Sequence, residues 1–480
     1  MGERIGNFSD DSAQTDPAAD RLGVAPFAER LAEILVQLDA PNGYVVGLSG
    51  EWGSGKTSAI NYVKHFLGKR ATPGAGETAS VLTIDFRPWL VSGHEDLVGA
   101  FFKVLAEELE HRPPIWKSLG AGAAAVGSEL SGLLSKVGWL TSHTDAGALA
   151  MSGAVLRKGL NKVAENWAAQ PSLQKTYGEL RGILRESATK ILVVIDDVDR
   201  LQPAEIRAMM MMVKTVGQLP NVVYLLSYDR NVVWPALQSG ALLLSRTNFA
   251  EKLVQQEVAL PVPGFDRLLA MLLEQAAFLS IDTEARRWGE FQEVALQRWL
   301  RTPRDAIRLV NNMRFAWPVL RDHLDPIDYV AIEGARTFDK TLFDWIRDNP
   351  SFLFSTRHYS YKPDGAFSEA QAFKARLSPD AVEATIDVAK FLFPNHKKYF
   401  DFKNEDETKG KAIATAFGET QESLIDRKGL NSSPSYDAYF RLYQPSGRNL
   451  RVESVLGFRC VVSRASLAHA NRNFDCRLGI

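Results

Sequence analysis

The stretch "GLSGEWGSGKTSAINYV", residues 47–63, constrains this chain of 480 residues more than any other. A short apolar run, "YVVGLSG", comes before its glycine-rich centre, and a segment with helical character follows. Glycines allow a tight turn to point successive backbone N–H groups at an anion, and the start of a helix adds a positive dipole end. The stretch therefore predicts a strand, a phosphate-binding loop and a helix in succession.

The centre of this stretch matches the pattern G-x-x-x-x-G-K-[ST] at every position. Lys56 is expected to reach the β- and γ-phosphates and to take part in catalysis, and the Thr57 hydroxyl is expected to ligate Mg²⁺. A glycine-rich corner without a ligand is the alternative, but the flanking strand and helix favour the phosphate cradle. The predicted nucleotide-binding residues are Gly50, Glu51, Trp52, Gly53, Ser54, Gly55, Lys56, Thr57 and Ser58.

A second element, "ILVVIDDVDR" at residues 191–200, reads as a strand buried on both faces that ends in acids. Asp196 is expected to hold Mg²⁺ through water, and Asp197 to orient or deprotonate the attacking water. Adjacent carboxylates at a buried strand end repel each other unless a cation is near, which favours a metal site over solvated acids. Asp199 is assigned less firmly, as a cap for the following segment.

Two further places are candidates for sensing the γ-phosphate. The strand over residues 221–229 ends near Ser227 and Asp229, and either residue can equally cap the following helix. In "TPRD", residues 302–305, threonine is expected to be an N-cap and proline the first helical residue. Arg304 could then lie over the phosphates as a lid arginine, with Arg308 one turn later, although a surface salt bridge is the competing interpretation.

Other candidate residues carry weaker signals. His65, His94 and His111 lack ligand partners at useful spacing and are expected to be surface or structural residues. The candidates for an arginine finger that acts in trans are Arg200, Arg230 and Arg246.

The order of apolar runs predicts an α/β protein with a parallel sheet. Residues 1–19 are polar and acidic and are expected to be disordered. Residues 20–262 contain the strand–helix alternation, and residues 97–170 within them are rich in small residues and read as packed helices rather than membrane spans, because charges interrupt their apolar runs. Prolines around Gly264 mark a boundary to a helical region at 263–345, and residues 346–480 are expected to be mainly helical.

The composition limits the kinds of binding partner that are expected. Lys and Arg number 56 and Asp and Glu 57, so there is no global attraction for nucleic acid or an anionic membrane. Nucleic-acid binding has no sequence signal but stays open, as does membrane contact through residues 113–160. Two cysteines and a polar N-terminus favour a cytoplasmic, reducing location. No separate nuclease, protease or deaminase constellation is found in the sequence.

Taken in order, these motifs resemble those of the KAP family of P-loop NTPases. The resemblance rests on "GEWGSGKTS", "DFRPW", "IDDVDR", the strand ending "SYD", "FAEKLVQQEVALPVP", "TPRDAIRLVNN" and "SYDAYFRLY", and "DRLGVAPFAERLAEIL" fits where the family is thought to approach the base. It implies a P-loop NTPase core of the ASCE type with a helical insertion, a helical lid and ATP as the nucleotide. Many members carry transmembrane helices in the insertion, and several bacterial ones act in exclusion of phage, sometimes beside partner proteins.

Two functions follow as expectations. The first is a Mg²⁺-dependent ATPase that acts as a switch or motor and controls a protein partner, with antiphage defence implied by the resemblance. The alternative is an ATP-binding scaffold with little hydrolysis that assembles a complex, at a membrane surface or elsewhere. A small-molecule kinase is a weaker third expectation, because two adjacent acids suit water activation. A homo-oligomer is also compatible with the sequence.

Overall fold

A computed structural model describes residues 11–70, 81–90, 190–216, 218–238, 253–350, 353, 363–401 and 426–443, with parts of 100–108 and 178–186. In the described residues, five strands form one parallel sheet in the order β2-β3-β4-β1-β5. The strands are β1 (Tyr44–Ser49), β2 (Val81–Phe86), β3 (Lys190–Ile195), β4 (Val222–Tyr228) and β5 (Gln256–Ala259). The parallel sheet predicted from the apolar runs is confirmed.

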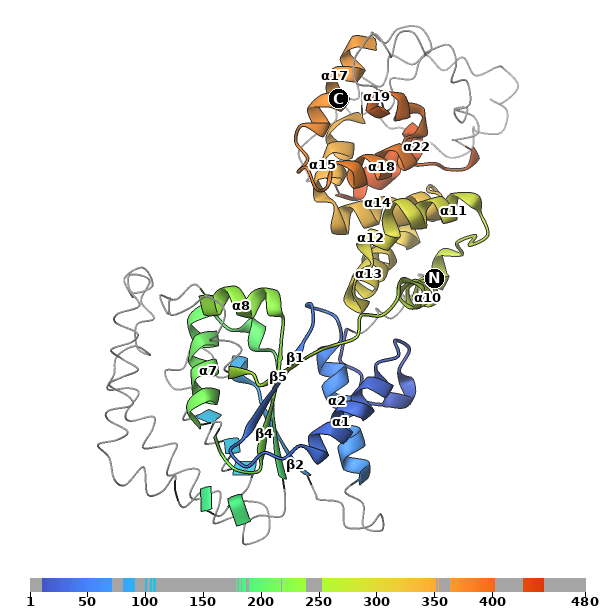
Figure 1. Ribbon diagram of the computed structural model, residues 1–480. Helices are drawn as coiled ribbons and strands as arrows, with labels where there is room; N and C mark the ends of the chain where they lie inside the picture. Colours follow the sequence, from blue (N-terminus) through green and yellow to red (C-terminus); the bar gives the residue numbers. More distant parts are fainter. Residues whose placement is uncertain are drawn as a thin grey trace, which may run out of the picture.

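Helices cover both faces of this sheet (Figure 1). On one face lie α1 (Ala25–Gln37) and α2 (Lys56–Arg70), and on the other α7 (Pro203–Val216) and α8 (Arg230–Gln238). Successive residues of a strand point to opposite faces, so neighbours in β4 enter different cores. Tyr224 packs on the side of α7, and Val223 and Leu225 pack on the side of α1.

Three of the four consecutive methionines in α7 belong to the core. Met209, Met210 and Met212 are each at most 3% exposed and pack with the β3 and β4 side chains on that face. Unbranched methionine side chains adapt to the irregular surface of a twisted sheet.

The chain beyond β5 is helical in its described parts and builds one apolar core from Leu268 to Phe440. The predicted boundary at residue 345 therefore does not divide this core, and we refer to all of it as the helical region. Its helices are α10 (Phe265–Gln275), α11 (Arg286–Phe291), α12 (Gln297–Trp299), α13 (Pro303–Leu320), α14 (Pro326–Phe338), α15 (Lys340–Asp348), α17 (Pro363–Lys374), α18 (Val382–Leu392), α19 (Lys397–Asp401) and α22 (Ser433–Tyr443).

Short turns complete the described backbone. Five are 3₁₀ turns, and a π-helical turn joins α11 to α12. They are η1 (Pro17–Ala19), η2 (Pro88–Leu90), η3 (Val198–Arg200), η4 (Ala277–Leu279), the π turn η5 (Gln292–Leu296) and η6 (Pro394–His396).

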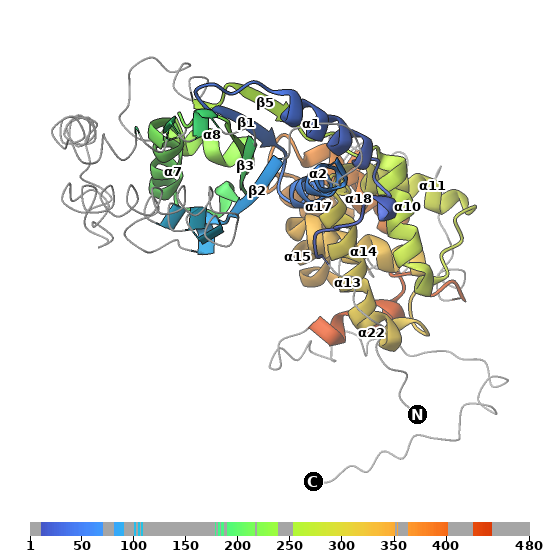
Figure 2. The same cartoon turned by 90° about the horizontal axis from the view of Figure 1, so that it is seen from below.

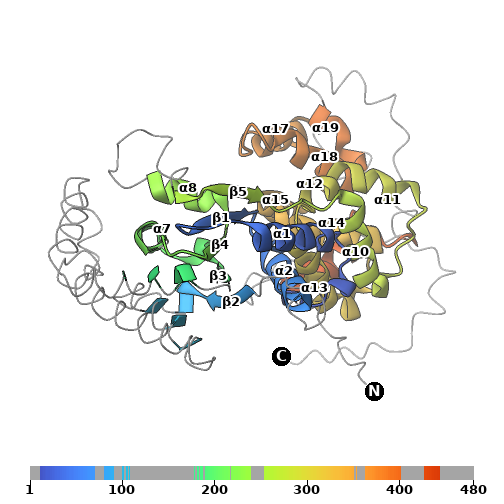
Figure 3. The same ribbon diagram turned by 60° about the horizontal axis from the view of Figure 1, so that its bottom comes forward.

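The helical region lies on the side of the sheet that α1 and α2 cover, as Figures 2 and 3 show from two further directions. The segment before α1 connects the two parts of the molecule. Arg267 of α10 donates a hydrogen bond to the Leu22 carbonyl, and Arg21 forms an ion pair with Glu274. Gly23 has a φ of +76°, and a Cβ there would lie 1.6 Å from the Arg267 guanidinium. The positive φ favours glycine, and a larger residue here would have to displace the guanidinium of Arg267.

The expectation of disorder over residues 1–19 is wrong for residues 11–19. Asp16 accepts a hydrogen bond from Ala18 N and caps η1, and Gln14 is hydrogen-bonded to α2. These long-range polar contacts leave no apolar signature in the sequence. Residues 1–10 and most of the predicted insertion at 97–170 lie outside the described residues. No described helix is long and apolar enough to cross a membrane.

Candidate nucleotide site

The loop between β1 and α2 has the geometry of an anion cradle. Gly53 and Gly55 have φ angles of +83° and +97°, which L side chains rarely adopt. Helix α2 begins at Lys56, so its free N–H groups open onto the loop. The Ser54 hydroxyl is buried and has no hydrogen-bond partner among the described residues. This loop therefore offers N–H and O–H donors to a phosphate.

Lys56 lies inside this loop and is 8% exposed. Its ammonium donates to the Gly50 carbonyl at 2.9 Å and to the Glu51 carbonyl at 3.3 Å. It also faces a carboxylate oxygen of Asp199 at 3.6 Å, and that aspartate is 7% exposed. Two backbone carbonyls and a carboxylate of the protein thus hold the ammonium in place.

Two oxygen donors meet where the sequence predicts the metal. The Thr57 hydroxyl donates to Asp196 Oδ2 at 2.9 Å, and Asp196 follows directly on β3. Mg²⁺ is bound in proteins by one or two oxygen side chains, with water and substrate phosphates completing its octahedron. A hydroxyl and a carboxylate beside a phosphate cradle fit this requirement. No group of three or more potential metal-ligating His, Cys, Asp or Glu side chains occurs in the described part of the chain.

Asp197 stands in an unusual conformation at the end of the same strand. Its φ and ψ of 60° and 39° place it in the left-handed region, which is uncommon for any residue but glycine. Its side chain lines the cavity and forms an ion pair with Arg200 at 3.0 Å. Burial, helped by the Asp196 carboxylate, raises the pKa of Asp197, while Arg200 opposes the shift. A carboxylate with a raised pKa is a better proton acceptor near neutral pH.

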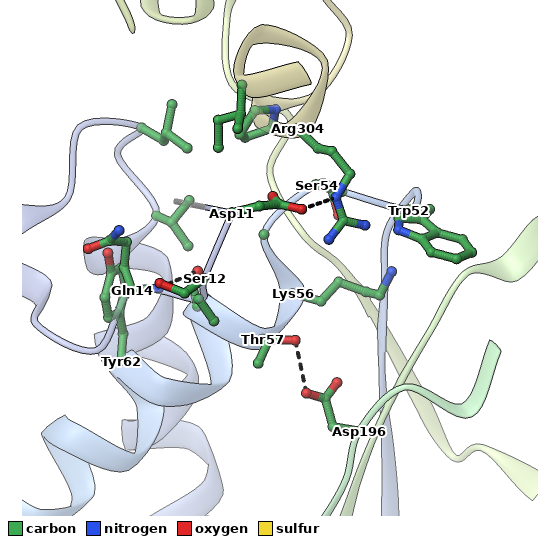
Figure 4. Close-up of a pocket in the computed structure, with 18 of the residues that line it drawn as sticks. Asp11, Ser12, Gln14, Trp52, Ser54, Lys56, Thr57, Tyr62, Asp196 and Arg304 are labelled. Atoms are coloured by element: carbon green, nitrogen blue, oxygen red, sulfur yellow. Dashed lines mark hydrogen bonds and ion pairs between the residues drawn. The ribbon is translucent and has the colours of Figure 1, made fainter. Parts of the chain in front are cut away.

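The helical region contributes Arg304 from the first turn of α13. Thr302 caps this helix through a reciprocal capping box with Asp305, and Pro303 is the first helical residue, both as the sequence predicts. A Cβ on Gly53 would lie 2.6 Å from the Arg304 Cβ, so the arginine packs directly on the phosphate loop. In Figure 4 it lies above Lys56 and Thr57, and Trp52 lies beside it.

These elements enclose a cavity of about 520 Å³, within the usual range for ligand sites. Figure 4 shows the Asp11 carboxylate directed at Arg304, with a distance of 2.8 Å between Asp11 Oδ2 and Arg304 Nε. Gln14 follows on the same segment, where its N–H donates to the Ser58 hydroxyl at 3.1 Å. Residues 11–14 therefore lie over the start of α2, and a carboxylate already neutralises the arginine of the helical region.

The two candidate sensors, Ser227 in β4 and Asp229 directly after it, do not line the cavity. Ser227 is fully buried within the strand, and its hydroxyl has no partner among the described residues. Asp229 accepts from the N–H groups of Trp52 and Asn231, at 3.1 and 2.9 Å. It therefore holds the phosphate loop against β4 and caps α8, which is the capping alternative. A sensor role for either residue stays a prediction.

The remaining arginine and histidine candidates differ in whether they line the cavity. Arg200 lines the cavity, where it pairs with Asp197 and lies over the ring of Trp89. Arg230 is paired with Glu257 outside the cavity, and the exposed Arg308 does not line it. Arg246 and two of the histidines, His94 and His111, lie outside the described residues. His65 packs edge-on against Phe66, away from the cavity.

Sequence reasoning missed three contributors to the site. Asp199 faces Lys56 rather than capping a helix. Its place as the third acid of "DDVD" was the sequence signal that could have indicated a role in the site. Arg87 and Trp89 also line the cavity, and their motif, "DFRPW", carries the family resemblance but no predicted role. The segment from Asp11 to Leu22 forms a wall, and no local pattern indicated it.

Comparison with known proteins agrees with this geometry. The sequence profile of the KAP family P-loop domain matches residues 24–319. The phage T7 exclusion protein of Escherichia coli (strain K12) is 26% identical over an alignment of 354 residues, and the alignment covers 70% of this chain and 47% of that protein. The chain thus spans about half the length of that relative.

Similar solved structures include those of Cdc6p and ORC. Cdc6p from Pyrobaculum aerophilum aligns over 80% of this chain and 89% of its own, with 12% identity and a TM-score of 0.34. Drosophila ORC bound to DNA aligns over 92% of this chain and 97% of the matched chain, with 10% identity and a TM-score of 0.35. At TM-scores below 0.5, neither similarity adds to the assignment of fold or function.

Proposed function

This chain belongs to the KAP family of P-loop NTPases, and on that premise we propose that it is a Mg²⁺-dependent ATPase that switches a partner effector in exclusion of phage. The observation that carries the proposal is one cavity that joins an anion cradle, a hydroxyl–carboxylate pair, a second carboxylate and an arginine of the helical region. The phage T7 exclusion protein supports the biological setting by similarity.

In this proposal each part of ATP binding and hydrolysis is assigned to particular residues of the chain. Backbone N–H groups of the loop and Lys56 bind the phosphates, and Thr57 and Asp196 hold Mg²⁺, which neutralises charge on the phosphate oxygens when bound. Asp197 accepts a proton from the attacking water, which its raised pKa favours. Arg304 supplies positive charge from the helical region. Because Arg304 belongs to α13, the phosphate state is transmitted to that region.

Steady-state ATP hydrolysis with Mg²⁺ tests the enzymatic half of the proposal. Lys56→Ala and Asp197→Asn should each lower the rate by about 100-fold or more, because one removes phosphate binding and the other the proton acceptor. Lys64→Ala is the matched control, since this lysine is also on α2 but pairs with Asp85 outside the cavity. Tight ATP binding without turnover in the wild type would instead favour a scaffold.

The biological half is tested by the plating efficiency of phage on cells that carry the wild type, Asp197→Asn or Lys64→Ala. The wild type and Lys64→Ala should reduce plating, and Asp197→Asn should not. Equal protection by Asp197→Asn, at equal protein levels, would separate hydrolysis from exclusion and refute the switch.

A further inference from the structure

One part of the cavity has no role in binding phosphates or metal. It is contributed by the segment before α1, by α2, by the last turn of α10 and by α13. Its apolar and aromatic side chains are Leu22, Val24, Tyr62, Met271 and Ile307, and the charged Asp20 and Arg21 line the cavity beside them. Such a surface, continuous with a phosphate cradle, suits the flat faces of a nucleobase.

One polar group stands out within this apolar surface. Gln275 is the last residue of α10 and lines the cavity, and its side-chain Oε1 is buried without a hydrogen-bond partner among the described residues. Its backbone carbonyl accepts from Arg314 at 2.8 Å, which fixes the helix end from the opposite element. Met271 lies one turn earlier, so both side chains project from the same face of α10.

A buried acceptor without a donor costs free energy, and native structures rarely keep one without a reason. The group that satisfies it must carry an N–H or O–H donor on an otherwise flat, apolar body. The exocyclic 6-amino group of adenine meets this description. Guanine and hypoxanthine place a carbonyl oxygen at the same position, which would oppose the Gln275 oxygen with a second acceptor.

We propose that Gln275 is a specificity-determining residue whose amide oxygen accepts a hydrogen bond from the 6-amino group of adenine. The proposal rests on the nucleotide-binding function proposed above and names the base that this site selects. Met271 and Leu22 then contact the ring, and the Gln275 side chain, whose Oε1 has no exposed surface in this structure, rotates to place that oxygen at the ring edge. Nucleotide selection is thereby shared between the P-loop domain and the helical region, because Gln275 and Met271 belong to α10.

The test is equilibrium binding of ADP, IDP, GDP and purine riboside diphosphate, measured by calorimetry on the full chain. The wild type should bind ADP about tenfold or more tightly than the other three, because only ADP donates a hydrogen to the Gln275 oxygen. In Gln275→Leu this preference should fall to nearly one. Gln275→Glu keeps an acceptor and should retain the preference, although its added charge weakens all four nucleotides.

Gln297→Leu is the matched control, since Gln297 is exposed on α12 and does not line the cavity. It should leave the ADP preference unchanged, and thermal unfolding of each variant reports whether the fold is kept. Equal binding of all four nucleotides by the wild type, a preference for GDP, or an ADP preference that survives in Gln275→Leu would overturn the assignment. Absence of binding to any nucleotide would instead refute the proposed function.

Discussion

The three aspartates that follow β3 have three different surroundings. Asp196 accepts from Thr57, Asp197 pairs with Arg200, and Asp199 faces Lys56 from a buried position. One oxygen of Asp199 has no hydrogen-bond partner among the described residues. We interpret Asp199 as the group that holds the loop lysine in position while no phosphate is bound.

Replacing this carboxylate gives the first prediction. Asp199→Asn leaves the buried Lys56 ammonium without a counter-charge, so the free energy of unfolding without nucleotide should fall by about 1–3 kcal/mol. A bound phosphate supplies the missing negative charge, so added ADP should raise the unfolding temperature of the variant more than that of the wild type. Differential scanning fluorimetry with and without ADP measures both effects.

The matched control is Asp85→Asn, which removes the carboxylate of an ion pair with Lys64 in which the aspartate is 47% exposed. Exposed pairs contribute at most about 1 kcal/mol, and this one lies outside the cavity. Its response to ADP should equal that of the wild type. An equal response from Asp199→Asn would contradict the role given to Asp199.

The second prediction concerns Asp11, whose carboxylate neutralises Arg304 and adds negative charge to the anion site. Asp11→Asn should tighten ADP binding by about two- to fivefold, a modest change because both partners of the pair are partly exposed. Titration calorimetry at low and high salt measures this. Weaker binding in the variant would show that Asp11 assists the nucleotide rather than competing with it.

At the scale of elements, a buried charge cluster fastens the last described helix to α14. Asp328 is fully buried and is paired with Arg287 and Arg427, and it accepts from the Leu430 N–H at 2.8 Å. Asp325 caps α14 and faces Arg427 at 3.5 Å. The tyrosine hydroxyls of α22 add further links, since Tyr439 donates to the buried Glu333 carboxylate at 2.9 Å. The motif "SYDAYFRLY" near the C-terminal end of the described chain thus packs into the core of the helical region.

A pH-dependent stability follows from this cluster and gives the third prediction. Burial, and next the Asp328 carboxylate, raises the pKa of Asp325. The folded state then holds the proton more tightly than the unfolded chain. The contribution of Asp325 to the free energy of unfolding is therefore fully present below its ordinary pKa of ~3.9. That contribution is lost as the pH rises through the raised pKa of the folded state. Asp325→Asn keeps the cap and removes the charge, so its stability relative to the wild type should increase between pH 4 and pH 7.

Urea denaturation across that range measures the effect, and the exposed Asp322→Asn on the preceding loop is the control. A difference between Asp325→Asn and the wild type that does not change with pH would mean that this carboxyl titrates alike in the folded and unfolded states.

How well the sequence predicted the structure differs from one element to another. The phosphate loop, the acid-bearing strand and the cap of α13 were predicted because each lies within a few consecutive residues with a fixed pattern. The contact between Asp11 and Arg304 joins residues 293 positions apart, and that between Thr57 and Asp196 joins residues 139 apart. Only the second could be expected, because the carboxyl ends of parallel strands meet at one edge of a sheet. The polar segment at residues 11–19 is ordered by such long-range contacts, which leave no local signal.

At the scale of the whole molecule, the nucleotide site lies at the junction of the sheet and the helical region. Lys56 and Thr57 come from the sheet side, and Arg304, Met271 and Gln275 from the helical side. A ligand that contacts both parts favours their present arrangement over any other by the free energy of those contacts. The central claim is therefore that residues of the helical region bind the nucleotide directly.

The most direct test is the affinity of Mg·ATP for Asp197→Asn protein, in which turnover is suppressed, with and without a second substitution on α13. Arg304→Ala should weaken binding by about tenfold or more, because a charge-assisted contact to phosphate is lost. Arg308→Ala, one turn later on the same helix and outside the cavity, should leave the affinity unchanged. Unchanged affinity in Arg304→Ala would contradict the account, since the P-loop side alone would then hold the nucleotide.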